Sequence, residues 1–127
     1  HVGQDDMAAL DARAKLGPDK LIGVSAHTVE EALLAEKQGA DYLGVGAVFP
    51  TSSKSDVGEM SYETLKAICE AVSIPVVAIG GISGENVGKL AGSGICGVAV
   101  ISAIYAAKDV KAAAADLKAT VKEMLRA

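Results

Sequence analysis

Apolar residues along the chain form short continuous runs, and segments with helical spacing lie between them. The runs predict strands at residues 20–25, 42–46, 74–79 and 97–102, and residues 2–4 resemble the end of another strand. Apolar spacings of three and four predict helices at residues 6–16, 28–39, 61–72, 83–90 and from 109 onward. Continuous apolar strands are typical of a parallel sheet covered on both faces. We therefore predict one α/β domain, residues 1–127, built of right-handed βα units with the helices outside the strands.

Local signals indicate how the helices begin and which faces they bury. Thr28 and Glu31 have the spacing of a capping box, and Ser61 is suited to cap a later helix. The first helix is expected to bury a face formed by Met7, Leu10 and Ala14. The last helix is expected to bury a face formed by Val110, Ala114, Leu117, Val121 and Leu125.

Composition excludes several other classes of protein. Half of the 127 residues are apolar, which rules out a disordered tail, and two cysteines are too few for a disulfide mini-protein. The net charge of −4 argues against a nucleic-acid partner, and no apolar run approaches the ~18 residues of a membrane span. Cys69 and Cys96 lie within apolar patterns, so we expect buried free thiols in a reducing cytoplasm, with a disulfide or a reactive thiol as alternatives.

Polar residues gather just after the predicted strands. They occupy residues 4–6, 25–27, 50–54 and 80–83, together with Ser102. The carboxyl ends of parallel strands share one face of an α/β fold, and ligands bind there. Five converging loops therefore predict a ligand site at that face.

Two of these loops are suited to bind a phosphate. Gly80 and Gly81 allow close backbone approach, and a helix starting at Ser83 would offer free N–H groups. Ile101 and Ser102 end the next strand, in the region where a barrel commonly binds phosphate. The alternative is that the two glycines only form a tight turn.

The loop at residues 50–54 offers further anion ligands. Hydroxyl groups of Thr51 and Ser53 with the ammonium of Lys54 suit phosphate or pyrophosphate oxygens, although such a loop can also be merely solvated. Asp5 and Asp6 either begin a helix as capping acids or bind a cation such as Mg²⁺, which needs one or two carboxylates beside substrate phosphates.

Six motifs, in order along the chain, resemble the thiamine-phosphate synthase family. They are HVGQDD at residues 1–6, GVSAHT at 23–28, GADYLGVG at 39–46, FPTSSK at 49–54, PVVAIGGI at 75–82 and GVAVISAI at 97–104. The family is a (βα)8 TIM barrel that joins a pyrimidine diphosphate to a thiazole phosphate and releases pyrophosphate. The resemblance implies a transferase of thiamine biosynthesis in which pyrophosphate leaves first and the thiazole nitrogen then attacks a pyrimidine methyl cation.

The resemblance also implies roles for individual residues. Asp6 would bind Mg²⁺, while Ser25 and Lys54 would hold the pyrimidine diphosphate and act in catalysis. The thiazole phosphate would be held by Thr51, Ser53, Gly81, Ile101 and Ser102. Two departures are small: Ser53 replaces a usual Thr and keeps its hydroxyl, and Ile95-Cys96 replaces a small-acidic pair remote from the loops.

The extent of the resemblance is a larger departure. It begins at the end of strand 4 and runs through helix 8, and the chain opens at His1 without an initiating Met. We therefore expect the first three to four βα units to be absent, together with the family's Gln/Arg/Lys cluster for the diphosphate and an Asn-Asp pair that supplies a second Mg²⁺ ligand. The chain alone is expected to be inactive and to associate with the missing N-terminal half or with a copy of itself.

Two alternatives to the synthase remain open. The first is a thiazole tautomerase, a sister family in which a histidine acts in acid/base chemistry, with His27 as the candidate; a capping or packing histidine is the simpler interpretation. The loop at residues 50–54 favours the synthase, because the sister family departs there. The second alternative is a half-barrel without enzymatic activity.

Overall fold

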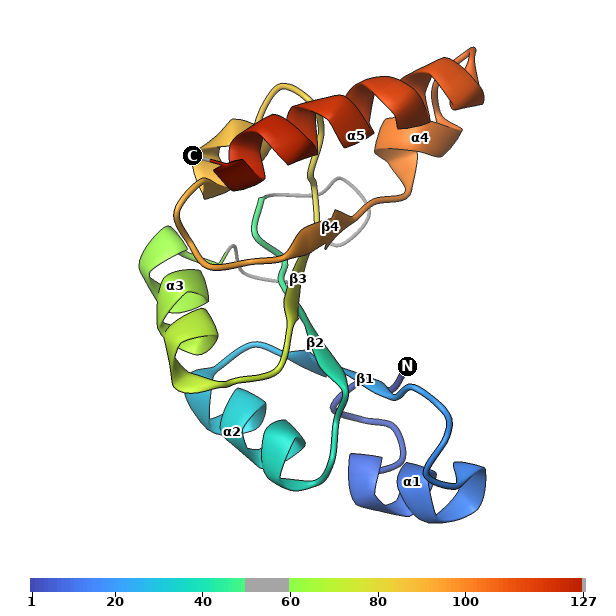
Figure 1. Ribbon diagram of the computed structural model, residues 1–127, viewed down its shortest axis with the longest axis vertical. Helices are drawn as coiled ribbons and strands as arrows, with labels where there is room; N and C mark the ends of the chain where they lie inside the picture. Colours follow the sequence, from blue (N-terminus) through green and yellow to red (C-terminus); the bar gives the residue numbers. More distant parts are fainter. Residues whose placement is uncertain (50–59, 127) are drawn as a thin grey trace.

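A parallel sheet forms the centre of the molecule. The computed structural model describes residues 1–49 and 60–126. Within them the strands are β1 (Gly23–Ala26), β2 (Tyr42–Val45), β3 (Val76–Ile79) and β4 (Gly97–Ala99). They pair in the order β1-β2-β3-β4, all parallel (Figure 1). The predicted α/β class and parallel sheet are confirmed, with each strand shorter than its apolar run.

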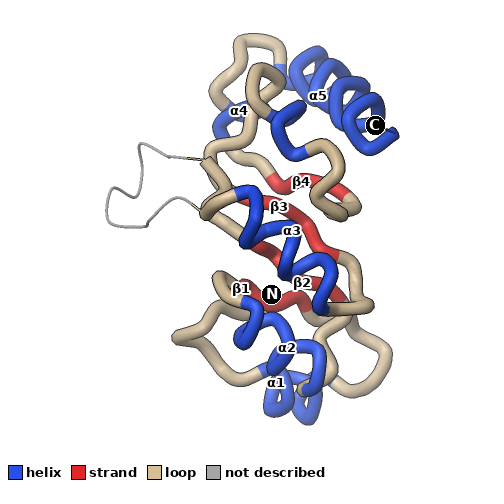
Figure 2. Tube along the Cα trace, turned by 90° about the vertical axis from the view of Figure 1, so that its left-hand side faces the viewer, coloured by secondary structure: helices blue, strands red, loops and turns tan. Residues whose placement is uncertain are grey.

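Helices alternate with the strands. Within the described residues they are α1 (Ala9–Leu16), α2 (Val29–Lys37), α3 (Tyr62–Ala71), the 3₁₀ helix η1 (Val87–Leu90), α4 (Ser102–Tyr105) and α5 (Val110–Arg126). α2 contacts β1, β2 and α3, and the two helices α2 and α3 lie together against one face of the sheet (Figures 1 and 2). α5 contacts η1, α4 and β4 at the other end of the sheet. None of these helices is long and apolar enough to cross a membrane.

The core is aliphatic, as a chain with 3% aromatic residues requires. Leu43 and Val45 from β2 are fully buried, and they belong to the same buried cluster as Leu65 and Ile68 from α3. Each fully buried side chain of this kind contributes about 1.5–3 kcal/mol of hydrophobic stabilisation. The faces of β2 and α3 that carry these residues therefore fix the sheet against its helices.

The segment before β1 pairs with the outer edge of the sheet through a single residue. Val2 makes an isolated parallel bridge to Val24, with its N–H donating to Gly23 O at 2.9 Å and its C=O accepting from Ser25 N at 2.9 Å. This confirms the predicted strand-like pairing at Val2, whereas Gln4 lies in a turn. It also fixes the position of His1 beside β1.

The predicted helix caps are confirmed, with one change of partner. Thr28 Oγ1 accepts from Glu31 N at 3.1 Å, and Ser61 Oγ accepts from Thr64 N at 3.1 Å. In a standard capping box the Glu31 carboxylate would accept from Thr28 N. Here Glu31 Oε1 accepts instead from the preceding N–H, that of His27, at 2.8 Å.

The predicted inner face of the first helix is wrong. α1 begins at Ala9 and buries Ala9 and Ala12, whereas the predicted face is exposed: Met7, Leu10 and Ala14. Arg13 explains the rotation of the helix. Its guanidinium donates to the carbonyl oxygens of residues 17, 20 and 39 and pairs with Asp41 Oδ2 at 2.7 Å, so this side of α1 is held against the chain around β1 and β2.

Three other local expectations also need correction. In α5, Leu117 and Met124 are buried, whereas Val110 and Leu125 are exposed. The helix predicted at residues 83–90 is only the single 3₁₀ turn η1, preceded by turns. The two thiols are free but not buried, because one lies half-buried on α3 and the other is exposed before β4: Cys69 and Cys96.

Candidate functional site

The carboxyl ends of the strands meet along one edge of the sheet. Ala26 is in register with Val45, and Ile79 is in register with Ala99. The loops after β2 and β3 touch, since the N–H of Val48 donates to Ile79 O at 3.0 Å. The structure thus brings together the segments after β2 and β3, two of the five loops for which convergence is predicted. Thr51, Ser53 and Lys54 lie outside the described residues.

Ser25 lies at the centre of a polar cluster on β1. Its Oγ is 2.9 Å from His1 Nε2, and His1 Nδ1 is 3.2 Å from the Tyr42 hydroxyl on β2. The side-chain amide of Gln4 donates to Ser25 O at 2.6 Å. Ser25 is half-exposed, so its hydroxyl is accessible from the side of the sheet that carries this cluster.

The acidic pair after the first segment does not begin a helix. α1 has Ala8 at its N-cap, so the capping interpretation of Asp5 and Asp6 is wrong. Asp6 instead closes a turn, in which Oδ2 accepts from Gly3 N at 2.7 Å and Asp6 N donates to Gly3 O at 3.2 Å. The other carboxylate oxygen of this exposed residue is available to a ligand.

Asp6 can supply only part of a magnesium site. A carboxylate oxygen is a ligand that Mg²⁺ prefers, and this ion is often held by one or two carboxylates together with substrate phosphates. No group of three or more metal-binding side chains is found in residues 1–49 and 60–126. Asp6 therefore fits a site that a bound diphosphate or another carboxylate must complete.

The turn after β3 requires glycine and is held by an asparagine. Gly80 and Gly81 have φ of +102° and +65°, a region that favours glycine. Asn86 Nδ2 donates to Gly81 O at 2.8 Å, and Asn86 Oδ1 accepts from Ser83 N at 2.8 Å. The Ser83 N–H is therefore occupied, and the prediction that a helix starting there offers it to a phosphate is wrong.

The turn after β4 differs from the turn after β3, because the N–H groups at the start of α4 have no acceptor within the helix. Ile101 is the N-cap of α4 and is 73% exposed, and Ser102 begins the helix. Its first N–H groups have no intrahelical acceptor, because the helix has no preceding turn. Gly81 and Ser102 thus lie in successive turns beyond the paired strands β3 and β4, as the phosphate prediction requires.

His27 makes its polar contacts within its own helix start. Its ring Nδ1 lies 3.3 Å from Glu31 Oε1, and the same oxygen accepts the His27 N–H. The geometry matches the simpler of the two interpretations, a histidine that helps to begin α2.

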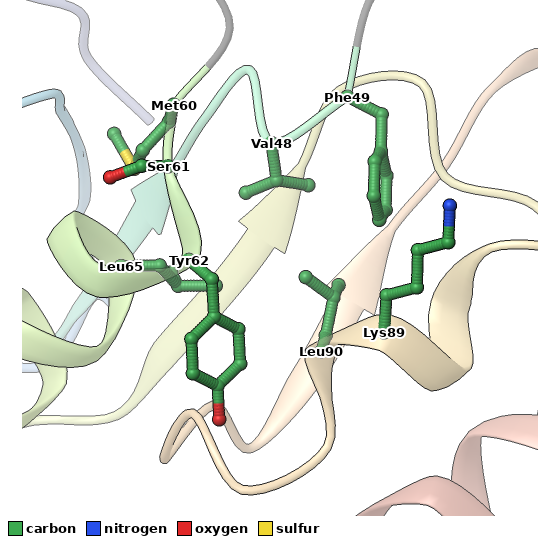
Figure 3. A pocket seen from close by; sticks show the side chains of 8 residues that line it. All are labelled: Val48, Phe49, Met60, Ser61, Tyr62, Leu65, Lys89 and Leu90. Carbon is green, nitrogen blue, oxygen red and sulfur yellow. The ribbon is translucent and has the colours of Figure 1, made fainter.

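An apolar pocket is lined in part by Val48 and Phe49, whose N–H groups donate to Ile79 O and Gly80 O. It has a volume of about 430 Å³ and opens between α3 and η1 (Figure 3). Its walls are formed by Val48, Phe49, Met60, Ser61, Tyr62, Leu65, Lys89 and Leu90. Among the described residues, none of the predicted phosphate or metal ligands lines it.

Sequence reasoning missed three polar contributors to the cluster and its neighbouring turn: His1, Tyr42 and Asn86. A signal for two of them was present in the strands. A Cβ built at Gly44 would lie 3.1 Å from His1 Cε1, and one built at Gly23 would overlap the Tyr42 ring. A glycine inside a strand often marks such a close approach.

Comparisons with known proteins identify the family of the chain. A family model described as thiamine monophosphate synthase matches residues 1–104. The chain is 56% identical over 117 residues to a thiamine-phosphate synthase of Clostridium tetani, covering 92% of this chain and 56% of that protein. It is 51% identical over 124 residues to one of Pyrococcus abyssi, covering 98% and 59%.

A solved structure gives the same result. The thiamine phosphate pyrophosphorylase from Pyrococcus furiosus superimposes with a TM-score of 0.87 at 46% identity, covering 98% of this chain and 59% of that one. Two of these relatives are named thiamine-phosphate synthase and the third thiamine phosphate pyrophosphorylase, which supports the synthase prediction over the tautomerase alternative. The chain spans somewhat more than half the length of each. On the family match and these identities, the chain belongs to the thiamine monophosphate synthase family.

Proposed function

We propose that this chain contributes the phosphate-binding side of an enzyme that joins hydroxymethylpyrimidine diphosphate to thiazole phosphate and releases pyrophosphate. The observation that carries the proposal is the pair of turns after β3 and β4. There, Gly81 lies in a turn with positive φ that a hydrogen bond from Asn86 holds. Ser102 begins α4, whose first N–H groups have no acceptor within the helix. Backbone N–H groups at such turns suit phosphate oxygens.

We propose further that the chain is the C-terminal part of a (βα)8 barrel, from the end of strand 4 through helix 8. The bridge at Val2 supports this assignment, because it adds the end of one more strand beside β1. β4 forms the opposite edge of the described sheet. Such edges carry unpaired backbone groups, so we expect the chain to associate with the remaining βα units or with a second copy. A monodisperse monomer in size-exclusion chromatography would contradict this association.

The chain's own residues would bind the negatively charged diphosphate and stabilise the charge of the leaving pyrophosphate. Ser25 and Lys54 would hold the diphosphate, and Asp6 would provide one oxygen ligand for Mg²⁺. The bound ion would supply neutralisation of the charge that develops on the leaving pyrophosphate. Lys54 would stabilise the same charge, which grows as the bond to the pyrimidine methylene breaks.

The thiazole phosphate would be held at the other end of the site. We assign its binding to Thr51, Ser53, Gly81, Ile101 and Ser102, with the last two acting through backbone N–H groups. Holding this phosphate positions the thiazole nitrogen to attack the pyrimidine cation. Positioning of this kind removes translational and rotational entropy from the barrier.

The proposal is tested by supplying both substrates and Mg²⁺ and measuring thiamine phosphate and pyrophosphate. We expect turnover by a protein that carries this chain within a complete barrel, and none by residues 1–127 alone. Addition of the N-terminal units to the chain should restore activity. Turnover by residues 1–127 alone would contradict the incomplete site, and no turnover by the complete barrel would contradict the function.

A variant tests the part of the site outside the described residues. Lys54→Ala in the complete barrel should lower kcat, because the leaving pyrophosphate loses a positive charge. Lys20→Ala is a suitable control, since Lys20 precedes β1 and is exposed at the opposite ends of the strands. Unchanged kinetics for Lys54→Ala would remove Lys54 from the site.

A further inference from the structure

Three polar side chains form a continuous hydrogen-bonded series across β1 and β2. The Tyr42 hydroxyl lies 3.2 Å from His1 Nδ1, and His1 Nε2 lies 2.9 Å from Ser25 Oγ. The two rings are tilted by 44° with centroids 5.7 Å apart. The N-terminal segment lies on the side of β1 away from α2 (Figure 1). The series therefore belongs to the face of the sheet opposite the α2 packing.

Glycine occupies the two strand positions that face the rings of Tyr42 and His1. The strand register pairs Gly23 with Tyr42, and Ser25 with Gly44. A Cβ at Gly23 would overlap the Tyr42 ring, and a Cβ at Gly44 would lie 3.1 Å from His1 Cε1. The local sequence thus provides the space that both rings occupy.

The residues that follow His1 are bonded to β1 through backbone and side-chain groups. Val2 is bonded to β1 through its N–H and its C=O, to Gly23 and Ser25 respectively. Gln4 adds a third contact to the same strand through Ser25 O at 2.6 Å. His1 therefore starts from a fixed backbone position, which limits the entropy lost when its ring bonds to Ser25.

The chemistry of the three groups favours one direction for the hydrogen bonds. A neutral imidazole has one donor nitrogen and one acceptor nitrogen, and a phenol hydroxyl can take either role. Because a phenol is a better donor than acceptor, the favoured arrangement has Tyr42 O–H donating to His1 Nδ1. In the tautomer that this requires, His1 Nε2–H donates to Ser25 Oγ, which leaves the Ser25 hydroxyl hydrogen to point at a ligand.

We propose that Tyr42 and His1 are positioning residues that orient the Ser25 hydroxyl as a donor to the diphosphate of the pyrimidine substrate. This inference rests on the function proposed above. A diphosphate oxygen accepts hydrogen bonds and donates none when ionised, so a serine committed to donation matches it. Without the bond to His1 the Ser25 hydroxyl would be free to rotate.

Kinetics in the complete barrel test the proposal. We expect Tyr42→Phe and His1→Ala each to lower kcat/KM for the pyrimidine diphosphate by about 2- to 10-fold, the effect of one net hydrogen bond. The KM for thiazole phosphate should not change. His1→Gln should recover part of the loss, because its side-chain N–H can donate to Ser25. Tyr62→Phe is the matched control, since the Tyr62 hydroxyl donates to Ala91 O at 2.8 Å elsewhere in the fold.

A double-mutant cycle separates positioning from general structural support. In a Ser25→Ala background the hydroxyl to be oriented is gone, so His1→Ala and Tyr42→Phe should have no further effect on kcat/KM. Full additivity of either variant with Ser25→Ala would overturn the proposal. Equal losses for Tyr62→Phe and Tyr42→Phe would overturn it as well.

The tautomer of His1 gives a readout that does not depend on activity. In ¹⁵N spectra of histidine-labelled protein, assigned with His1→Gln, we expect Nε2 protonated and Nδ1 accepting, and a change of tautomer population in Tyr42→Phe. Protonation at Nδ1 would overturn the proposed direction. If the complete barrel is inactive but shows the expected tautomer, the proposed function fails while the series itself stands.

Discussion

Gly23 begins β1 directly beneath the Tyr42 ring, and its replacement tests how the polar series is built. A Cβ at this position would lie 2.5 Å from Tyr42 Cε1 and nearer still to Cζ and the hydroxyl oxygen. Since these atoms are at the far end of a side chain, the ring can swing away. Gly23→Ala should therefore displace Tyr42 and break its bond to His1.

The expected cost follows from two opposing effects. Forcing an additional methyl group against a packed ring costs about 1–3 kcal/mol. Replacing glycine by alanine at a position with ordinary φ returns roughly 0.4–1 kcal/mol, because the unfolded chain loses conformational freedom. The net destabilisation is about 1–2 kcal/mol, which lowers the midpoint of thermal unfolding by about 4–8 °C for a chain of this length.

Gly97 provides the matched control. It begins β4 as Gly23 begins β1, and a Cβ built there meets no atom within 4 Å. Gly97→Ala should be neutral or slightly stabilising. Urea unfolding followed by circular dichroism measures both variants, with an unchanged m-value as the check that only stability has altered.

A second background decides whether the ring is the cause. In Tyr42→Ala the obstructing ring is gone, so the added Gly23→Ala should cost nothing or stabilise slightly. The coupling free energy between the two changes should then be about 1–3 kcal/mol, within the range for residues in contact. Additive effects, or a Gly23→Ala variant as stable as Gly97→Ala, would refute the reasoning.

Three further predictions concern the rest of the fold. Hydrogen bonds from Ser73 lower the pKa of Glu36 in the folded protein. The stabilisation that the Glu36 carboxylate gives is therefore complete above its pKa in the unfolded chain, and it is lost as the pH falls through its lower pKa in the folded protein. The free energy of unfolding of Glu36→Gln should accordingly depend less on pH below about 4.5 in acid unfolding. Burial raises the pKa of Cys69 to about 11, so iodoacetamide should modify it more slowly than exposed Cys96 in a mass-spectrometric time course. Leu43→Ala should lower the free energy of unfolding by about 2–5 kcal/mol, whereas Leu34→Ala at a 53% exposed position should change it by less than about 0.5 kcal/mol.

The strands could be predicted because they depend on local apolar runs, whereas the short helix α4 was not predicted and begins at the last residue of a predicted strand. Helix faces were less predictable when a distant contact decided them. Spacing alone favoured Leu10 on the inner face of α1, but the guanidinium of Arg13 bonds to groups up to 28 residues away, including Asp41. No pattern within the helix contains that information.

The site could be predicted at the level of loops but not of contacts. Parallel pairing alone brings the ends of β3 and β4 together, which is why Gly81 and Ser102 were identified from the sequence. The Asn86 side chain occupies the Ser83 N–H, a bond between positions three residues apart in a turn of irregular geometry. Spacing rules for regular helices do not apply to such a turn.

The two faces of β1 and β2 explain why the polar series is compatible with a stable sheet. One face carries buried aliphatic residues such as Val24 and Leu43, which belong to the hydrophobic core that holds the sheet to its helices. Residues of the other parity, Gly23, Ser25 and Gly44, contribute little apolar area. Each strand glycine costs roughly 0.5–1 kcal/mol relative to alanine, and that cost is acceptable only where a side chain would occupy needed space. Alternate residues of each strand thus serve the hydrophobic core on one face and the polar series on the other. Substitutions at Gly23 or Gly44 should therefore disturb the polar series more than the core.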